Sequence, residues 1–493
     1  MFNFPLAKFA RSAVTWIVIW LIYITQLSDN ILDVAAEVVR RASYEKLLEA
    51  TSSILRSIWE AAFEDIGSLP ILRNAVKSNE VNKATLQMVW FERTRLFRFL
   101  VELVECAKGF VPASSLDGAG PPNDPRIPDN ELDMSQTMNR HAVICQLQRL
   151  LKSLIFILGV MTSPATPVHQ IKMGDETELM TDAAAGLTIH VAPPPLPRSE
   201  KKTTEDEELV RRRNLQQEIR NEKWLFVNGI AGEKYWLYLA CRKIATTFSR
   251  EVTGVLNRGD GMLWDLIECG GERSTGDRGK TSSQDDLIQR TASSVEAQES
   301  LMKQLEGALK EAKTKGGRHV GAHVVMIAHS QGCLLLRLVL DELVTSGRAE
   351  SLDTSENLSV FTFGNPSIHW KVEGMSSDSA RHYLSSHSAR TEHFANEEDF
   401  VASLGVLRSY QALDDGDAQK RGYSSDVVFV NRESTWKNGH MFGAQYSLDP
   451  YHYRKTPDSW LLACKNLSMV KVTEQKSTAV PPVGCRATTP TVP

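Results

Sequence analysis

Apolar residues recur at three- and four-residue intervals through much of the N-terminal part of the chain. Two such blocks run over residues 30–110 and 138–160. This spacing places apolar side chains on one face of a helix. The intervening residues, 114–135, are rich in Pro, Gly and Asp, as expected of a loop. The pattern therefore predicts an all-helical region over residues 29–162.

The N-terminus has a different pattern, an uncharged and strongly apolar run. Residues 12–28 contain Trp and Tyr among aliphatic residues, and Lys8 and Arg11 precede them. A run of about 17 residues is near the lower limit for a membrane-spanning helix, and Trp and Tyr are typical of the membrane interface. We predict an anchor over residues 1–28 and a membrane-associated protein. A buried helix, or a helix lying in the bilayer surface, is the alternative.

From residue 222 onward, short apolar runs alternate with longer amphipathic segments. Such alternation is typical of strands and helices in an α/β domain with a mostly parallel sheet. The strands are expected at residues 224–227, 251–256, 324–329, 358–363, 392–396 and 426–431, and a helix is expected around residues 295–312.

The borders of this α/β domain follow from composition. Residues 163–221 contain a proline cluster and then a run of charges, and we expect a linker followed by a charged helix. The domain itself is predicted over residues 222–470, and the tail over residues 471–493 is predicted to be disordered. Within the domain, residues 273–286 are polar and contain glycine, which favours a plain loop over a lid.

One of the strand-to-helix junctions carries a candidate nucleophile. Ser330 stands directly between the apolar strand 324–329 and an apolar helical run, which is the context of a nucleophile elbow. The turn demands small neighbours, and Ala328 and Gly332 flank the serine at a distance of two residues. An ordinary buried turn between strand and helix is the alternative interpretation.

A serine hydroxyl needs a histidine base, and the histidine needs a carboxylate that orients it. Asp399 follows the strand at 392–396 and precedes the apolar run Phe400–Ala402, which would bury its carboxyl group. His440 follows the strand at 426–431 through a short loop with a glycine before the histidine. We predict Asp399 as the acid and His440 as the base. The rivals are Glu397 and Glu398 for the acid, and His452 for the base.

These segments resemble the α/β-hydrolase superfamily. Ala328–Gly332, Val360–Pro366 and Asn396–Asp399 are similar to the class 3 lipase branch, over roughly residues 222 to 470. Two positions depart from that pattern, Ala328 in place of the first elbow glycine and Cys333 in place of a later one. The resemblance does not reach the helical region that precedes this part of the chain. It implies an α/β-hydrolase fold for residues 222–470, and a serine esterase or lipase acting on ester or lipid substrates.

The resemblance also implies where the oxyanion hole lies. In this class of hydrolase, the loop after an early strand supplies one backbone N–H group. Here the strand at 224–227 is followed by Asn228 and Gly229, and the N–H groups of Ile230 and Gln331 are expected to form the hole. A simple glycine turn is the alternative. Asp265 and Glu268, further along, are expected to be helix-cap or pocket-rim residues and not catalysts.

Net charge and cysteine spacing bear on whether the protein binds nucleic acid or a metal ion. The net charge is −4, and no basic stripe indicates nucleic-acid binding. The seven cysteines are dispersed without metal-ligand spacing, which indicates reduced thiols and no metal site. We expect no cofactor. Two functions stay open: a serine hydrolase of carboxylic, lipid-like esters, and a non-catalytic scaffold or membrane-tethered binding protein with the same fold.

Overall fold

The computed structural model describes most of the predicted α/β domain. The described residues are 183–194, 219–259, 292–317, 321–376, 381–408, 427–432, 439–453, 459–465 and 467–479, with isolated positions elsewhere, among them 129–131, 139, 146, 149 and 265. The predicted anchor, most of the predicted helical region and the loop at 273–286 lie outside these residues. Within the described part, no helix is long and apolar enough to cross a membrane.

The centre of the domain is a seven-stranded sheet with the order β1-β3-β2-β4-β5-β6-β7. Its strands are β1 (Thr188–Val191), β2 (Glu222–Val227), β3 (Val252–Val255), β4 (His323–His329), β5 (Leu358–Phe363), β6 (Arg390–Asn396) and β7 (Val427–Asn431). All neighbouring pairs are parallel except β1 and β3, which are antiparallel. From β2 the chain adds β3 on one side and then β4 on the other. The carboxyl ends of β2 and β4 therefore meet where the strand order reverses, the usual place of a ligand site in such sheets.

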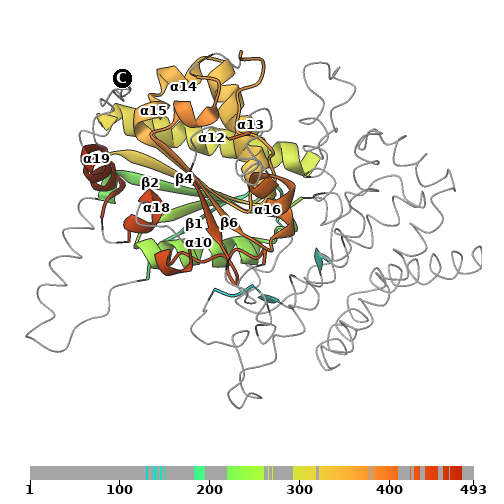
Figure 1. The fold of residues 1–493 in the computed structure, drawn as a ribbon. Helices are drawn as coiled ribbons and strands as arrows, with labels where there is room; N and C mark the ends of the chain where they lie inside the picture. The colour runs from blue at the N-terminus through green and yellow to red at the C-terminus, as the bar shows by residue number, and fades with distance from the viewer. Residues whose placement is uncertain are drawn as a thin grey trace, which may run out of the picture.

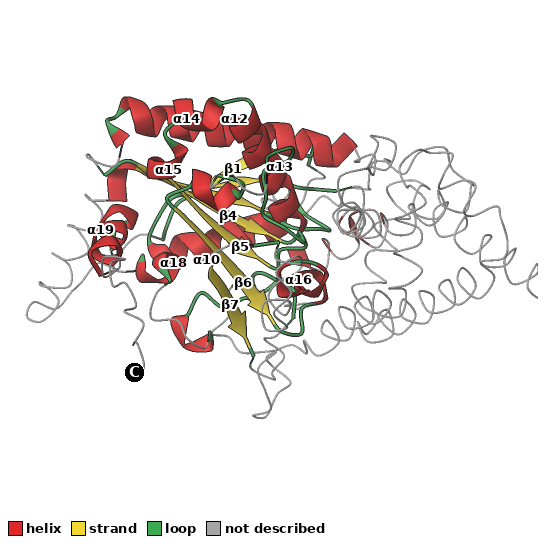
Figure 2. Cartoon of the chain, turned by 45° about the horizontal axis from the view of Figure 1, so that its top comes forward, coloured by secondary structure: helices red, strands yellow, loops and turns green. Residues whose placement is uncertain are grey.

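Helices cover both faces of the sheet (Figures 1 and 2). One face carries α12 (Ala292–Thr314) and α13 (Gln331–Thr345), with the short helices α14 (Arg348–Ser351) and α15 (Thr354–Asn357) beside them. The other face carries α10 (Lys234–Phe248), α18 (Trp460–Ala463) and α19 (Met469–Ala479). Further short helical elements among the described residues are α16 (Phe400–Leu404) and the 3₁₀ turns Ile219–Asn221, Leu384–His387 and Pro450–His452.

The central strand β4 is a nearly continuous apolar run because both of its faces are covered. In β4, Val324 and Met326 pack in the cluster under α12 and α13, whereas Val325 and Ile327 pack in the cluster under α10. Successive side chains of a strand point to opposite faces, so every residue of β4 is buried. The predicted α/β fold class with a mostly parallel central sheet is confirmed for the described residues.

Three boundaries differ from the prediction. Thr188–Val191 lies in the segment predicted as a linker, yet it forms the edge strand β1. Its strand conformation is stabilised by backbone hydrogen bonds to β3, and its own sequence has no clear strand pattern. The described end of the predicted charged helix is a 3₁₀ turn, and Glu222 already belongs to β2. Helix α19 continues to Ala479, into the tail predicted as disordered.

A buried ion pair fastens the C-terminal segment to the sheet. Arg250 and Glu222 lie 3.2 Å apart and are 2% and 0% exposed. The same guanidinium group donates to the carbonyl oxygens of Cys464 and Leu467, and the Glu222 carboxylate accepts from the backbone N–H of Met469. The loop between α18 and α19 is thereby tied to the start of β2.

Candidate active site

Ser330 occupies a sharp turn between β4 and α13. Its backbone angles, φ 56° and ψ −129°, are rare for a residue with a side chain and mark local strain. The Ser330 N–H donates to the carbonyl oxygen of Phe363 at 2.8 Å, which ties the turn to the end of β5. A Cβ atom on Gly332 would lie 2.6 Å from the carbonyl oxygen of Asn228, so the turn requires glycine there. The predicted elbow geometry is present.

The structure brings Ser330, His440 and Asp399 into one hydrogen-bonded chain. His440 Nε2 lies 2.8 Å from Ser330 Oγ, and His440 Nδ1 lies 2.9 Å from each carboxylate oxygen of Asp399. A carboxylate only accepts hydrogen bonds, so Nδ1 carries the proton and Nε2 is left to accept from the serine hydroxyl. All three side chains are buried. They follow β4, β6 and β7, whose carboxyl ends lie at the same edge of the sheet.

The Asp399 carboxylate is held by donors on several sides. It caps α16 by accepting from the N–H groups of Val401 and Ala402, and Tyr446 donates its hydroxyl to Oδ2 at 2.6 Å. Burial alone raises the pKa of Asp399, but attraction to His440 and the hydrogen bonds from His440 and Tyr446 outweigh it, so the pKa lies below its usual value. The rivals Glu397 and Glu398 are exposed.

Close packing against this carboxylate accounts for a glycine after β5. Gly364 has a φ of 60°, and a Cβ atom there would lie 2.8 Å from Asp399 Oδ2 and 3.4 Å from His440 Cε1. Only glycine combines this backbone conformation with the space that the acid and base occupy.

His440 belongs to a segment, residues 439–446, that we call the histidine loop. Lys243 on α10 donates from its Nζ to the carbonyl oxygens of Phe442, Gly443 and Tyr446 in this loop. Gln445 accepts from the N–H of Met441 through its side-chain oxygen. The loop is therefore held at several points of its backbone, which fixes the place of the imidazole ring.

His329, which precedes Ser330 in the elbow, supports the histidine loop as a neutral group. Its Nε2 donates to the carbonyl oxygen of His440 at 2.8 Å, and the two rings are 4.8 Å apart. Burial and the neighbouring His440 ring lower the pKa of His329 to about 3. A second positive charge beside His440 is thereby avoided. His452, the rival base, lies in a 3₁₀ turn and is hydrogen-bonded to Ser447, outside the chain of three residues.

Residues 228–232, which we call the oxyanion loop, lie directly against the serine. A Cβ atom on Gly229 would lie 2.3 Å from Ser330 Cβ, so glycine lets this backbone approach the nucleophile. Gln331 is the first residue of α13, at the end of the helix where the dipole favours negative charge. The assignment of the Ile230 and Gln331 N–H groups to an oxyanion hole stays a prediction.

The oxyanion loop is braced from the segment that follows β3. Asn257 donates through Nδ2 to Gln331 Oε1 at 2.8 Å, and its own N–H donates to Asn228 Oδ1. Asp265 Oδ2 accepts from the N–H of Ala231, a residue with a φ of 54°. Asp265, expected to be a helix-cap or pocket-rim residue, is fully buried and binds the backbone of the oxyanion loop.

Tyr446, Asn257 and Lys243 are site residues that the sequence pattern did not indicate. Each contacts the candidate triad or its loops across a long separation in sequence, and none lies in a recognisable motif. The apolar setting of Tyr446, next to the predicted base, was the one available signal. Among the described residues, no group of His, Cys, Asp and Glu is arranged to hold a metal ion.

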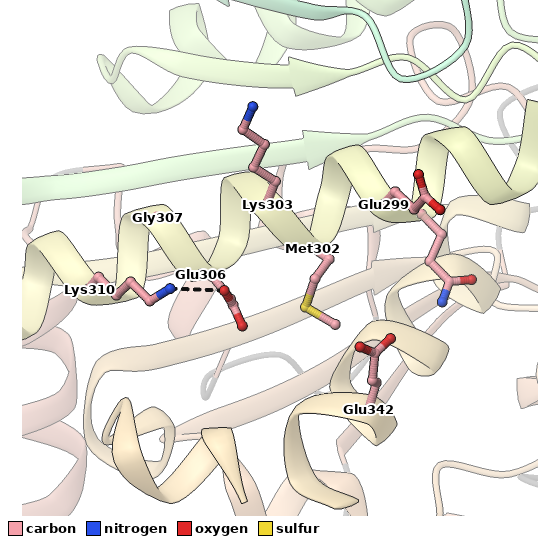
Figure 3. Close-up of a pocket in the computed structure, with 8 residues that line it drawn as sticks. Glu299, Met302, Lys303, Glu306, Gly307, Lys310 and Glu342 are labelled. Carbon is pink, nitrogen blue, oxygen red and sulfur yellow. Dashed lines mark hydrogen bonds and ion pairs between the residues drawn. The ribbon is translucent and has the colours of Figure 1, made fainter. Parts of the chain in front are cut away.

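A surface hollow of about 380 Å³ lies elsewhere, between α12 and α13 (Figure 3). Its lining includes Met302 and several charged side chains, with Lys310 and Glu306 paired at 3.0 Å. None of its lining residues belongs to the candidate triad or to the two loops around it.

Comparison with known proteins gives little further guidance. No protein-family model matches the chain, and no curated protein matches it. Among solved structures, one similar chain is esterase B of Lactobacillus rhamnosis, inhibited by a tributyrin phosphonate. It is 16% identical, the match covers 52% of this chain and 78% of the esterase, and the TM-score is 0.22. A likeness at this TM-score is too weak to assign a fold or an activity, so the candidate site rests on its own geometry.

Proposed function

We propose that this chain is a serine hydrolase that cleaves carboxylic esters through an acyl-enzyme. The observation that carries the proposal is the unbroken hydrogen-bonded chain from Asp399 through His440 to Ser330. Each member has the partner that nucleophilic catalysis requires: a base for the hydroxyl, and a buried carboxylate for the base. The strained elbow at Ser330 and the glycine backbone against it add the geometry of a reacting site.

In the proposed reaction, Ser330 Oγ attacks the carbonyl carbon while its proton passes to His440 Nε2. Asp399 stabilises the imidazolium that forms, and the N–H groups of Ile230 and Gln331 donate hydrogen bonds to the negatively charged carbonyl oxygen. When the intermediate collapses, the alkoxide leaves and takes the proton from His440 as an alcohol. Water then attacks the acyl-serine by the same route and releases the acid.

We further propose that the ester is lipid-like. The support is the resemblance of the Ser330, Gly364 and Asp399 segments to class 3 lipases, together with the apolar run at residues 12–28, which would hold the enzyme at a membrane. The triad by itself suits amides, thioesters and acyl transfer equally well. A panel of p-nitrophenyl esters with graded acyl chains tests this assignment, and the proposal expects the highest kcat/KM with longer chains.

The nucleophile is tested by a fluorophosphonate probe, which reacts with activated serines. We expect the full-length protein to be labelled and Ser330→Ala to show no labelling and no esterase activity. Ser346→Ala, at the exposed end of α13, is the matched control and should be labelled like the wild type. Mass spectrometry of the labelled peptide checks that the adduct is on Ser330.

A folded protein that the probe does not label would reject the hydrolase. It would favour the alternative, a non-catalytic protein that uses the same fold as a scaffold or membrane-tethered binding module.

A further inference from the structure

Residues before the α/β domain pack against the helix and the loop that hold the candidate site. The described positions between 129 and 149 are almost all buried, although they precede the sheet in the chain. Asn139, Ala142, Gln146 and Arg149 are helical and recur at intervals of three and four residues, so they lie on one helical face. We call the described residues between 129 and 149 the N-terminal brace.

The first contact of the brace is with the histidine loop. The N–H of Gly443 donates to Glu131 Oε1 at 2.7 Å. A Cβ atom on Gly443 would lie 2.2 Å from the carbonyl oxygen of Asp129 and 2.2 Å from Glu131 Oε2. The glycine therefore lets the backbone of the brace approach the loop closely. Burial raises the pKa of Glu131, although the bond from Gly443 and the charge of Lys243 oppose it.

The second set of contacts is with α10, the helix that follows the oxyanion loop. Asp129 pairs with Arg242, and Asn139 Oδ1 accepts from Trp236 Nε1 at 3.0 Å. At the start of the same helix, Gln146 Nε2 and Arg149 Nε both donate to Glu233 Oε1, at 2.6 and 3.3 Å. Since Lys243 of α10 also binds the histidine loop, the brace, α10 and that loop form one connected unit.

We propose that the N-terminal brace positions His440, with Glu131 as the positioning residue that holds the histidine loop through Gly443. The catalytic part of this inference rests on the proposed function. The contact between Glu131 and the histidine loop does not depend on that function. Glu131 does not touch the triad and acts only through the backbone that carries His440. Proton transfer between Ser330 and His440 depends steeply on their separation, so a loosened loop lowers turnover more than substrate binding.

Glu131→Ala in the full-length protein is the direct test, with Glu131→Gln as the conservative variant and Glu251→Ala, at an exposed position, as the matched control. The alanine variant should lower kcat, and the rate of fluorophosphonate labelling, by about tenfold with KM nearly unchanged. Glu131→Gln keeps a carbonyl oxygen for the Gly443 N–H and should restore most of the activity. Hydrogen exchange of peptides over residues 440–446 should be faster in the alanine variant alone.

Several outcomes would overturn the proposal. One is a folded Glu131→Ala protein with wild-type kcat, labelling rate and hydrogen exchange. Another is an equal loss of activity in the Ala and Gln variants while hydrogen exchange in the histidine loop stays unchanged. If the alanine variant does not fold, Glu131→Asp, which withdraws the carboxylate by one methylene group, is measured by the same criteria. If the wild type is not labelled, the proposed hydrolase fails, and the exchange measurement still decides whether Glu131 holds the loop.

Discussion

At the scale of single residues, the two nitrogens of the His440 ring face different partners, and this difference suits His440 to act as a base toward Ser330. Nδ1 donates to Asp399, while Nε2 faces the Ser330 hydroxyl. His452 has no such pair: its Nδ1 contacts Ser447, beside the exposed Tyr451. A general base must reach the proton that it removes, so geometry separates two histidines of the same chemical type.

His440→Ala should reduce esterase turnover by several orders of magnitude, because it removes the group that accepts the Ser330 proton. His452→Ala should keep most of the activity and change the free energy of unfolding by about 1 kcal/mol. Steady-state kinetics on a short-chain p-nitrophenyl ester measure the first effect, and urea denaturation the second. Inactivity of His452→Ala together with an active His440→Ala would move the base to His452.

Chain order was enough to predict the meeting of Ser330, Asp399 and His440. Residues that follow parallel strands arrive at one edge of a sheet, so three reactive side chains after three strands are brought together. Tyr446 could not be predicted in the same way. Its hydroxyl reaches Asp399 only because the histidine loop folds back over the sheet, and no local pattern encodes that path.

At the scale of elements, the oxyanion loop is held by a residue that is distant from it in the sequence. Asn257, just after β3, contacts Asn228 in the loop and Gln331 at the start of α13. It thus connects the two backbone segments whose N–H groups we propose to form the oxyanion hole. Donors that are fixed in advance stabilise a developing negative charge better than donors that must reorganise.

Asn257→Ala should therefore lower kcat by about 10- to 100-fold, with a smaller change in KM, since a misplaced oxyanion donor weakens binding of the transition state. Thr253→Ala is the control, because Thr253 lies on β3, shortly before Asn257, and is hydrogen-bonded to the exposed His190 of the edge strand β1. The kinetics of both variants on one soluble ester provide the comparison. A wild-type kcat for Asn257→Ala would show that this side chain does not organise the hole.

Buried elements were easier to predict than edge elements. β4 and β5 are buried throughout and largely apolar, because helices cover both of their faces, and such runs are visible in the sequence. β1 has the sequence Thr-Ile-His-Val with only Val191 buried, so its strand conformation comes from pairing with β3. Helix α19 is largely polar, and the contact of Met469 with Glu222 that anchors its start links residues far apart in the chain.

For the whole molecule, the buried pair of Arg250 and Glu222 joins the first parallel strand to the last helices. Arg250 donates to carbonyl oxygens on either side of the turn between α18 and α19. The guanidinium also stacks over Trp224, with its Cζ atom 5.2 Å from the ring centre. The C-terminal segment is therefore held to the sheet by groups that have no contact with the candidate triad.

Arg250→Met should lower the free energy of unfolding by about 3 to 5 kcal/mol, because it leaves the Glu222 carboxylate buried without its partner. Arg348→Met is the control: Arg348 pairs with Glu306 and Glu342 at the surface, where such pairs contribute about 1 kcal/mol or less. Urea denaturation gives both values. Esterase activity per folded molecule should be unchanged in each, and a small effect of Arg250→Met would contradict a structural role for the pair.

The edge strand β1 has a consequence for self-association. By pairing with β3, it covers a row of backbone N–H and C=O groups beside the buried side chains of Val252 and Val255. An uncovered strand edge of this kind recruits strands from other molecules. A fragment that began at β2 would keep Ser330, Asp399 and His440 but would expose that edge in every copy. Such a fragment would therefore aggregate through β3, in addition to lacking the N-terminal brace, even though its reacting groups are all retained.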